Sequence, residues 1–422
     1  MTHDHASLVA SPWAAMTAEP DDRSRPAAPV GTPGEVFGAF LKLGLTSFGG
    51  PVAHLGYFRD ELVERRRWID EAGYADLVAL CQFLPGPASS QVGYALGLLR
   101  GGPLGGLAAW CAFTLPSALL LASFAFGAAY LQGPVGAGLV HGLKLVAVAV
   151  VAQAVWSMAR ALAPDRPRAA IALAAVLVVV LFGGAQSQVA AILAGAVAGV
   201  GFCRGAGGAP RGRLTFPVSR RAGLVALAAF FILLAGLPLA SMATGAHGVA
   251  LVDAFYRAGA LVFGGGHVVL PLLEEGVVRP GWIGPDAFLA GYGAAQAVPG
   301  PLFTFAAFLG AAMEPSPSGI VGAALCLAAI FAPGLLLVTG VLPFWDALRA
   351  RPLAQAAMRG ANAAVVGVLA SALYSPVWTS AVLSPRDFAV ALVGFVLLTV
   401  WKCPPWIVVV LTAVGSMGLA LI

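Results

Sequence analysis

The sequence predicts an all-α polytopic membrane protein made of two homologous halves. Two observations support this prediction. The 422 residues are 59% hydrophobic and only 10% charged, whereas a soluble domain carries about 25% charged residues. In addition, one pattern of helix-breaking residues occurs twice, starting at Phe48 and again 215 residues later at Phe263.

The repeated pattern has two parts in each half. The copies are Phe48-Gly49-Gly50-Pro51 with Gln82-Phe83-Leu84-Pro85-Gly86-Pro87, and Phe263-Gly264-Gly265-Gly266 with Gln296-Ala297-Val298-Pro299-Gly300-Pro301. A break in a helix leaves backbone polar groups without partners, and hydrocarbon tolerates this only where protein or a cavity satisfies them. Paired breaks in two halves therefore point to a site for a transported solute.

The chain order gives four regions. Residues 1–34 are polar and Pro-rich and predict a disordered cytoplasmic tail. Residues 35–203 form the first repeat, 204–249 a basic linker with a joining transmembrane helix, and 250–422 the second repeat. Each repeat has two broken apolar units, at 35–57 and 71–99 and at 249–277 and 285–313. Long apolar runs follow at 103–131, 138–159, 168–182 and 187–203, and at 317–343, 357–375, 387–401 and 404–422.

The broken units predict re-entrant helical hairpins, so that each half contributes about four full spans and the joining helix makes nine. An odd joining helix inverts the second half, which makes the halves antiparallel. With the N-terminus in the cytoplasm, only Arg279 and Arg386 fall in outside loops, as the excess of Lys and Arg in cytoplasmic loops requires. We therefore expect a multi-pass protein of the cell inner membrane. The alternative topology treats some broken units as true spans.

The breaks also predict an electrostatic property. After each break the chain restarts a helix, at Pro51, Pro87, Gly266 and Pro301, and a helix N-terminus offers free N–H groups and a positive dipole end to an anion. Four such ends that meet near the membrane midplane would form an anion site. The alternative is that the glycines and prolines only kink packed helices.

Three cations lie within apolar segments and are candidates for anion contact, because a charge in the membrane is costly unless it is paired. Lys42 and Arg257 are repeat equivalents one to two turns before the first breaks, with Glu35 and Asp253 as expected partners. Lys144 is the third, and Asn362 is its repeat equivalent. The alternatives are a structural ion pair or a side chain that reaches the membrane interface.

Small polar residues around the breaks complete the predicted substrate site, although helix packing and capping also explain them. The candidate residues are Lys42, Ser47, Gly49, Gly50, Pro51, Gln82, Pro85, Gly86, Pro87, Ser89, Ser90, Gln91, Lys144, Arg257, Gly264, Gly265, Gly266, Gln296, Pro299, Gly300 and Pro301. His54 and His267 follow the first breaks. They are candidates for proton coupling or are simply packed histidines.

Other functional classes have no signal in the sequence. The five cysteines are scattered without metal-ligand spacing, so neither a metal site nor a disulfide framework is expected. No nucleophile elbow, phosphate-binding loop or dinucleotide motif occurs, and no cofactor or enzymatic activity is predicted. The net charge of +5 comes from short loops and does not indicate nucleic-acid binding.

Several of these segments resemble the chromate ion transporter family, in its long two-half form. The resemblance rests on Phe37 to His54, Trp68-Ile69-Asp70, Gln82 to Gln91, Phe263 to Pro271 and Ala295 to Pro301, and it covers nearly all of 35–422. It implies antiparallel halves and export of chromate from the cytoplasm, which confers resistance, with sulfate as a similar competitor. Gly266 departs from the proline at Pro51, so the two first breaks are not expected to contact the ion identically.

The function predicted from the residues together with the resemblance is a secondary transporter of chromate, with membrane lipids around it and a homodimer as one possible assembly. Three alternatives stay open at this point. One is a carrier of sulfate or another oxyanion. The second is an intramembrane enzyme acting on lipid-linked substrates, and the third is a channel.

Overall fold

The computed structural model describes residues 31–128, 133–204, 216–263, 266–349 and 351–419. Every regular element in these ranges is a helix, which confirms the all-α prediction. The expected disordered tail lies outside the described residues up to Val30, as does most of the linker, at 205–215. Gly264 and Gly265, two candidate site residues, also lie outside them.

The chain forms a long series of helices joined by short turns. The first half contains α1 (Pro33–Thr46), α2 (Gly50–Phe58), α3 (Glu71–Phe83), α4 (Ala88–Ala128), α5 (Gly133–Leu162), α6 (Arg166–Phe182) and α7 (Gly184–Phe202), and α8 (Arg220–Thr244) follows. The second half contains α9 (His247–Leu261), α10 (Val269–Leu273), α11 (Pro285–Ala295), α12 (Phe305–Ala312), α13 (Gly319–Val341), α14 (Trp345–Arg349), α15 (Pro352–Ala372), α16 (Thr379–Ala381), α17 (Pro385–Thr399) and α18 (Pro405–Leu419).

Local sequence explains where several helices begin. The Thr32 hydroxyl accepts a hydrogen bond from the Glu35 N–H, and Pro33 occupies the first turn of α1, where its missing N–H costs nothing. The Asp70 carboxylate accepts from the Gly73 N–H at an N···O distance of 2.6 Å and caps α3 in the same way. These caps fix the ends of helices that lead into the breaks.

Five of the described helical stretches are long and apolar enough to cross a membrane. They are Ala88–Gly127, Val135–Leu162, Arg220–Thr244, Gly319–Leu348 and Pro352–Ala381. The other four predicted spans correspond to α6, α7, α17 and α18, which have 15 to 19 residues. A span needs about 20 residues, with about 17 as the lower limit, so the crossing of the membrane by these four helices stays a prediction.

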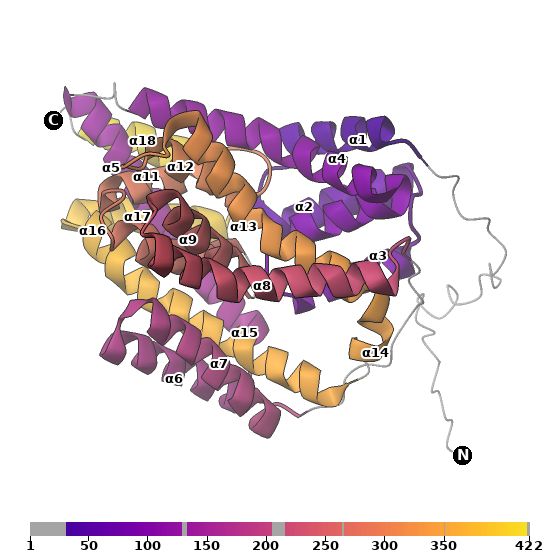
Figure 1. Ribbon diagram of the computed structural model, residues 1–422. Coiled ribbons are helices and arrows are strands. Elements are labelled where there is room, and N and C mark those ends of the chain that lie inside the picture. The colour runs from indigo at the N-terminus through magenta and orange to yellow at the C-terminus, as the bar shows by residue number, and fades with distance from the viewer. Residues whose placement is uncertain (1–30, 129–132, 205–215, 264–265, 350, 420–422) are drawn as a thin grey trace, which may run out of the picture. The chain divides into compact units, whose positions relative to one another are not determined.

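The two halves pack together through α5 of the first half and α15 of the second. Helix α5 packs along α17 and α18 of the second half, and its repeat equivalent α15 packs along α6 and α7 of the first. Figure 1 shows the α6–α7 hairpin lying along α15. Glycines allow this close approach: a Cβ on Gly360 would lie 2.0 Å from the Gly195 carbonyl oxygen, and one on Gly142 would lie 2.7 Å from the Ala413 Cα.

Candidate functional site

The first break of the first half separates α1 from α2. The last α-helical residue is Thr46, and Gly49 and Gly50 then adopt φ angles of 101° and 79° that disfavour any side chain. Helix α2 restarts at Gly50 with Pro51 in its first turn. The predicted helix restart is therefore present at this break, and Ser47 is buried between the two helices.

The second break of the first half separates α3 from α4. Phe83 ends α3, Gly86 has a φ of 120°, and α4 restarts at Ala88 directly after Pro87. The Gln91 amide closes the turn, because its Nε2 donates to the Pro85 carbonyl oxygen at 2.9 Å. The same Nε2 lies 3.1 Å from the Gly334 carbonyl oxygen of α13, so this break is tied to the second half.

The breaks of the second half restart differently. After the first one, Gly266–Val268 form a 3₁₀ turn before the five-residue helix α10, and after the second, Leu302–Thr304 form another before α12. A helix therefore restarts after these two breaks as well, but its first turn is 3₁₀ and not α. Thr304 gives part of the physical reason, because its hydroxyl donates to the Pro301 carbonyl oxygen at 2.7 Å and tightens that turn.

The breaks contact one another across the two halves through a pair of matching hydrogen bonds. The Gly86 N–H donates to the Val262 carbonyl oxygen at 2.7 Å, and the Gly300 N–H donates to the Ser47 carbonyl oxygen at 2.9 Å. Gly300 follows Gly86 by 214 residues and Val262 follows Ser47 by 215. The same contact thus occurs twice with the halves exchanged.

Each of the two glycines also touches the long helix of the opposite half. A Cβ on Gly86 would lie 3.1 Å from the Gly334 Cα of α13, and one on Gly300 would lie 2.7 Å from the Ser117 Oγ of α4. Gly334 and Ser117 each follow a proline inside their helix, Pro333 and Pro116. Through these contacts, each second break packs against the long helix of the opposite half.

A cavity of about 330 Å³ borders the first-half breaks. Its lining includes the candidate residues Pro51, Gln82 and Gly86. Asn362, from α15 of the second half, faces them, together with Ser157 from the end of α5. The cavity is large enough for a small anion and its water, and most of its lining is apolar, as is usual for solute sites.

Buried polar atoms without hydrogen-bond partners gather around the breaks. Among the described residues, these atoms include Ser47 Oγ, His54 Nε2, Ser90 Oγ, Gln91 Oε1, Thr114 Oγ1, Gln296 Nε2 and Asn362 Oδ1. Buried polar groups are almost always paired in proteins, so each exception calls for a reason. A hydrated polar solute that donates and accepts hydrogen bonds would satisfy this set.

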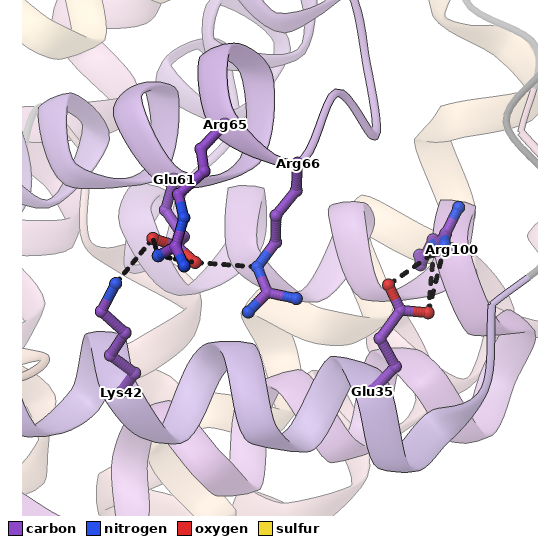
Figure 2. A network of polar contacts seen from close by, with 6 residues as sticks. All are labelled: Glu35, Lys42, Glu61, Arg65, Arg66 and Arg100. Carbon is purple, nitrogen blue, oxygen red and sulfur yellow. Dashed lines mark hydrogen bonds and ion pairs between the residues drawn. The ribbon is translucent and has the colours of Figure 1, made fainter.

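The structure corrects the expected partner of Lys42. Its Nζ lies 2.8 Å from Glu61 Oε2, whereas Glu35 pairs with Arg100. Glu35 and Lys42 are seven residues apart on α1, or about 10 Å along the axis, too far for a pair. Arg65 and Arg66 each approach the buried Glu61 carboxylate to 2.8 Å. Figure 2 shows these three cations directed at Glu61 and the Glu35–Arg100 pair beside them.

The Glu61 carboxylate is held ionised by this cluster, in a π-helical turn spanning Arg59–Arg65. Burial alone would raise its pKa, but the hydrogen bonds from Lys42, Arg66 and Arg65 outweigh that effect and lower the pKa to about 2. The Lys42 side chain remains 52% exposed and does not line the cavity at the breaks.

The other two candidate cations also have carboxylate partners. Arg257 Nη2 lies 2.7 Å from Asp253 Oδ2, as the sequence predicted. Lys144 Nζ lies 2.7 Å from Asp286 Oδ1 and lines a different cavity from the one at the breaks. The structure thus brings the small polar residues of the first half together at the breaks, and it places the cations elsewhere.

The two candidate histidines occupy different surroundings. His54 is buried, with Nδ1 3.3 Å from the Ser89 hydroxyl, whereas His267 Nδ1 lies 2.8 Å from the Tyr292 hydroxyl. The pairing of Lys42 with Glu61 and of Lys144 with Asp286, and the place of Ser157 in the cavity lining, were not predicted from the sequence. Asn362 had a signal, since it is the repeat equivalent of Lys144. Glu61 and Asp286 had no such signal, because they lie far in the sequence from the lysines that they pair with.

The chain is similar in sequence to several known proteins. The chain is 29% identical to a chromate transport protein of Pseudomonas aeruginosa over 91% of each chain. It is 28% identical to a probable chromate transport protein of Synechococcus elongatus over 89% of this chain and 93% of the relative. A chromate transport protein of Cupriavidus metallidurans is 30% identical over 79% of this chain and 80% of its own. No solved structure matches.

The family profile described as Chromate transporter matches the chain twice, at residues 34–200 and 249–418. These matches contain both copies of the broken pattern and most of the described helices. They account for the two halves and for the multi-pass helical architecture. This is a family of transporters and not of enzymes. The chain is therefore a membrane protein that belongs to the chromate transporter family.

Proposed function

We propose that the protein is a secondary transporter that carries chromate out of the cytoplasm across the cell inner membrane, and that this export confers chromate resistance. The observation that carries the proposal is the cavity at the first-half breaks, whose lining includes the unpaired amide oxygen of Asn362, together with the unpaired buried polar atoms of Ser47, Ser90 and Gln91 within the same breaks. The Ser47 and Ser90 hydroxyls can donate to a small oxyanion, and the Gln91 and Asn362 amide oxygens can accept from its water.

The membrane potential supports the outward direction. Moving one elementary charge through 100 mV is worth roughly 2.3 kcal/mol, so a dianion that leaves an inside-negative cell gains roughly 4.6 kcal/mol. Export therefore needs no coupled ion, whereas uptake would require cotransport of more than two positive charges. Sulfate carries the same charge, and we propose it as a competitor at the same site.

We further propose that residues 35–203 and 250–422 form inverted repeats with the N-terminus in the cytoplasm, and that the broken units are re-entrant hairpins. The matching bonds of Gly86 and Gly300 support a symmetric relation between the halves, since each half offers the other the same contact. The near absence of basic residues from the predicted outside loops supports the orientation.

Purified protein in liposomes tests the substrate. We expect chromate uptake that excess sulfate inhibits and that protein-free liposomes do not show. Movement of sulfate or another oxyanion without chromate would keep the architecture but reject the substrate. Absence of any anion flux from a folded, correctly inserted protein would contradict the proposal.

Lys42 and Arg257 lie outside the lining of this cavity, and we propose that these positive charges at repeat-equivalent positions act on the anion from a distance. We expect Lys42→Ala and Arg257→Ala each to reduce chromate flux several-fold, because a charge acts on a dianion over many ångströms in a membrane. Lys402→Ala, at an exposed residue between α17 and α18, is the matched control and is expected to leave flux unchanged. Wild-type flux in either test variant would show that this residue does not act on the anion.

A further inference from the structure

A second cavity, of about 510 Å³, lies apart from the one at the breaks and shares no lining residue with it. It is formed by the first turns of α5, α11 and α17 and by the last turns of α18. The polar residues that line it are His141, Lys144, Asp286, Ser384, Arg386, Asp387 and Ser416. This is the most highly charged of the cavities described here, and the chromate site proposed above does not use it.

The two members of the Lys144–Asp286 pair in this cavity differ in solvent exposure. The Lys144 side chain is 7% exposed, whereas the Asp286 side chain, 2.7 Å away, is 73% exposed. A buried ammonium needs an anion beside it, because removing a charge from water is costly unless the charge is paired. An exposed carboxylate, in contrast, can turn into water at little cost. Asp286 is thus a counter-ion that another anion can replace.

Two further features favour an anion in the cavity. Arg386 has no carboxylate partner among the described residues, whereas Asp387 is already engaged, with one oxygen 2.7 Å from His141 Nε2 and the other 3.0 Å from the Leu383 N. Ser416 is only 5% exposed, and its hydroxyl has no hydrogen-bond partner among the described residues. When Asp286 turns away, Asp387 is the one carboxylate left beside Lys144 and Arg386 in the cavity lining, and it is already hydrogen-bonded to His141 and Leu383.

We propose that this cavity is a second binding site for a small oxyanion dianion, in which the anion takes the place of the Asp286 carboxylate on Lys144. Arg386 adds a second positive charge, and the Ser416 hydroxyl supplies a donor. The inference rests on the proposed function only for the identity of the anion, because the charge arrangement does not depend on transport.

The repeat relation gives the second site a role. Lys144 and Asn362 are equivalent positions of the two halves, and each lines one of the two cavities. The solute therefore meets a neutral amide in one cavity and an ammonium in the other. In the topology proposed above, the cavity with Lys144 lies at the outer side, where it would receive the anion after it leaves the breaks.

Equilibrium binding of radiolabelled sulfate to the purified full-length protein, with chromate as competitor, tests this site. Asp286→Asn removes the internal competitor, and we expect it to tighten binding by up to about fivefold, as loss of a partly exposed ion pair allows. Adding Lys144→Met should abolish that gain, and adding Lys144→Arg should preserve it. Asp60→Asn removes an equally exposed carboxylate elsewhere and should leave binding unchanged.

Lys144→Met alone gives a second readout, since it should reduce the bound sulfate from two ions per chain to one. Binding by Asp286→Asn that equals the wild type, or a gain that survives Lys144→Met, would overturn the second site. If Asp286→Asn does not fold, an unchanged stoichiometry in Lys144→Met overturns it instead. Tighter binding in a protein that shows no anion flux would uphold the site and reject the transport function.

Discussion

Glu61 is the residue at which the charges of the first half converge. One buried carboxylate accepts hydrogen bonds from a lysine on α1 and from two arginines at the end of the following π-helical turn. Breaking such a buried arrangement by removing the common partner leaves several cations without an anion. The cluster therefore joins α1 to the turn after α2 and stabilises the segment that contains the first break.

The acid sensitivity of this cluster can be predicted. The folded-state pKa of Glu61, about 2, lies below its ordinary value of 4.5. The ionised carboxylate therefore stabilises the fold above about pH 4.5, and this contribution is lost as the pH falls toward 2. We expect Glu61→Gln to lower the free energy of unfolding at pH 7 by about 2 kcal/mol, because its three donors are partly exposed.

Melting temperatures in detergent measure this effect. The difference between wild type and Glu61→Gln should be largest near neutral pH and should shrink below pH 4.5, where the Glu61 carboxylate of the unfolded wild type takes up a proton. Comparing the two proteins at each pH cancels the contribution of the other carboxylates. A difference that stays constant down to the lowest pH at which both proteins fold would contradict the assigned pKa.

The glycines of the second breaks give another prediction for single residues. A Cβ on Gly86 would lie 2.9 Å from Gln91 Nε2 and 3.1 Å from the Gly334 Cα, at a φ that disfavours side chains. Gly281 also has a positive φ but open space around it, so Gly281→Ala is the matched control. We expect Gly86→Ala to destabilise the protein by about 1–3 kcal/mol more than the control and to reduce chromate flux.

Thermal melts and liposome flux of both variants test this. Equal losses of stability and flux in the two variants would show that only backbone strain matters, and that the close contact between the second break and α13 does not.

At the scale of helices, contacts between small residues hold α15 against α7. A Cβ on Gly199 would lie 2.4 Å from the Ala356 carbonyl oxygen, whereas one on Gly201 in the same helix would meet nothing within 4 Å. We expect Gly199→Ala to cost about 1–3 kcal/mol in the free energy of unfolding, since the helices must separate. Gly201→Ala should be neutral or stabilising, because alanine favours a helix over glycine.

Unfolding of the two variants in denaturant distinguishes these outcomes. If Gly199→Ala were as stable as Gly201→Ala, the helices would not be held at the distance that the structure gives.

The helix breaks could be predicted from the sequence because glycine and proline act locally. Gly86 and Gly300 can adopt positive φ angles in any surroundings, and the prolines on either side of each glycine identify the two copies of the repeated pattern. The 3₁₀ restart at Gly266 was not predictable, because turns beyond the break decide it. The Lys42–Glu61 pair was missed for a similar reason. A charged residue 19 positions away reaches Lys42 only once α2 has folded back, and no periodicity within α1 indicates that.

At the scale of the whole protein, the contacts of Gly86 and Gly300 with the opposite halves and the packing of α5 and α15 form one pattern. Each half supplies the other with the same contacts, so the breaks are held by both halves together. A movement of one half relative to the other would therefore change both second breaks at once. The cavity at the first-half breaks, which Asn362 of the second half also lines, would change with them.

The most direct test is net chromate flux in proteoliposomes with equal chromate on both sides and a potassium diffusion potential of about 100 mV of either sign. We expect chromate to move toward the positive side, to reverse direction with the potential and to be inhibited by sulfate. The driving force for a dianion, roughly 4.6 kcal/mol, corresponds to a concentration ratio of more than about a thousandfold at equilibrium. Chromate flux that ignores the potential and follows only a co-ion gradient would contradict it.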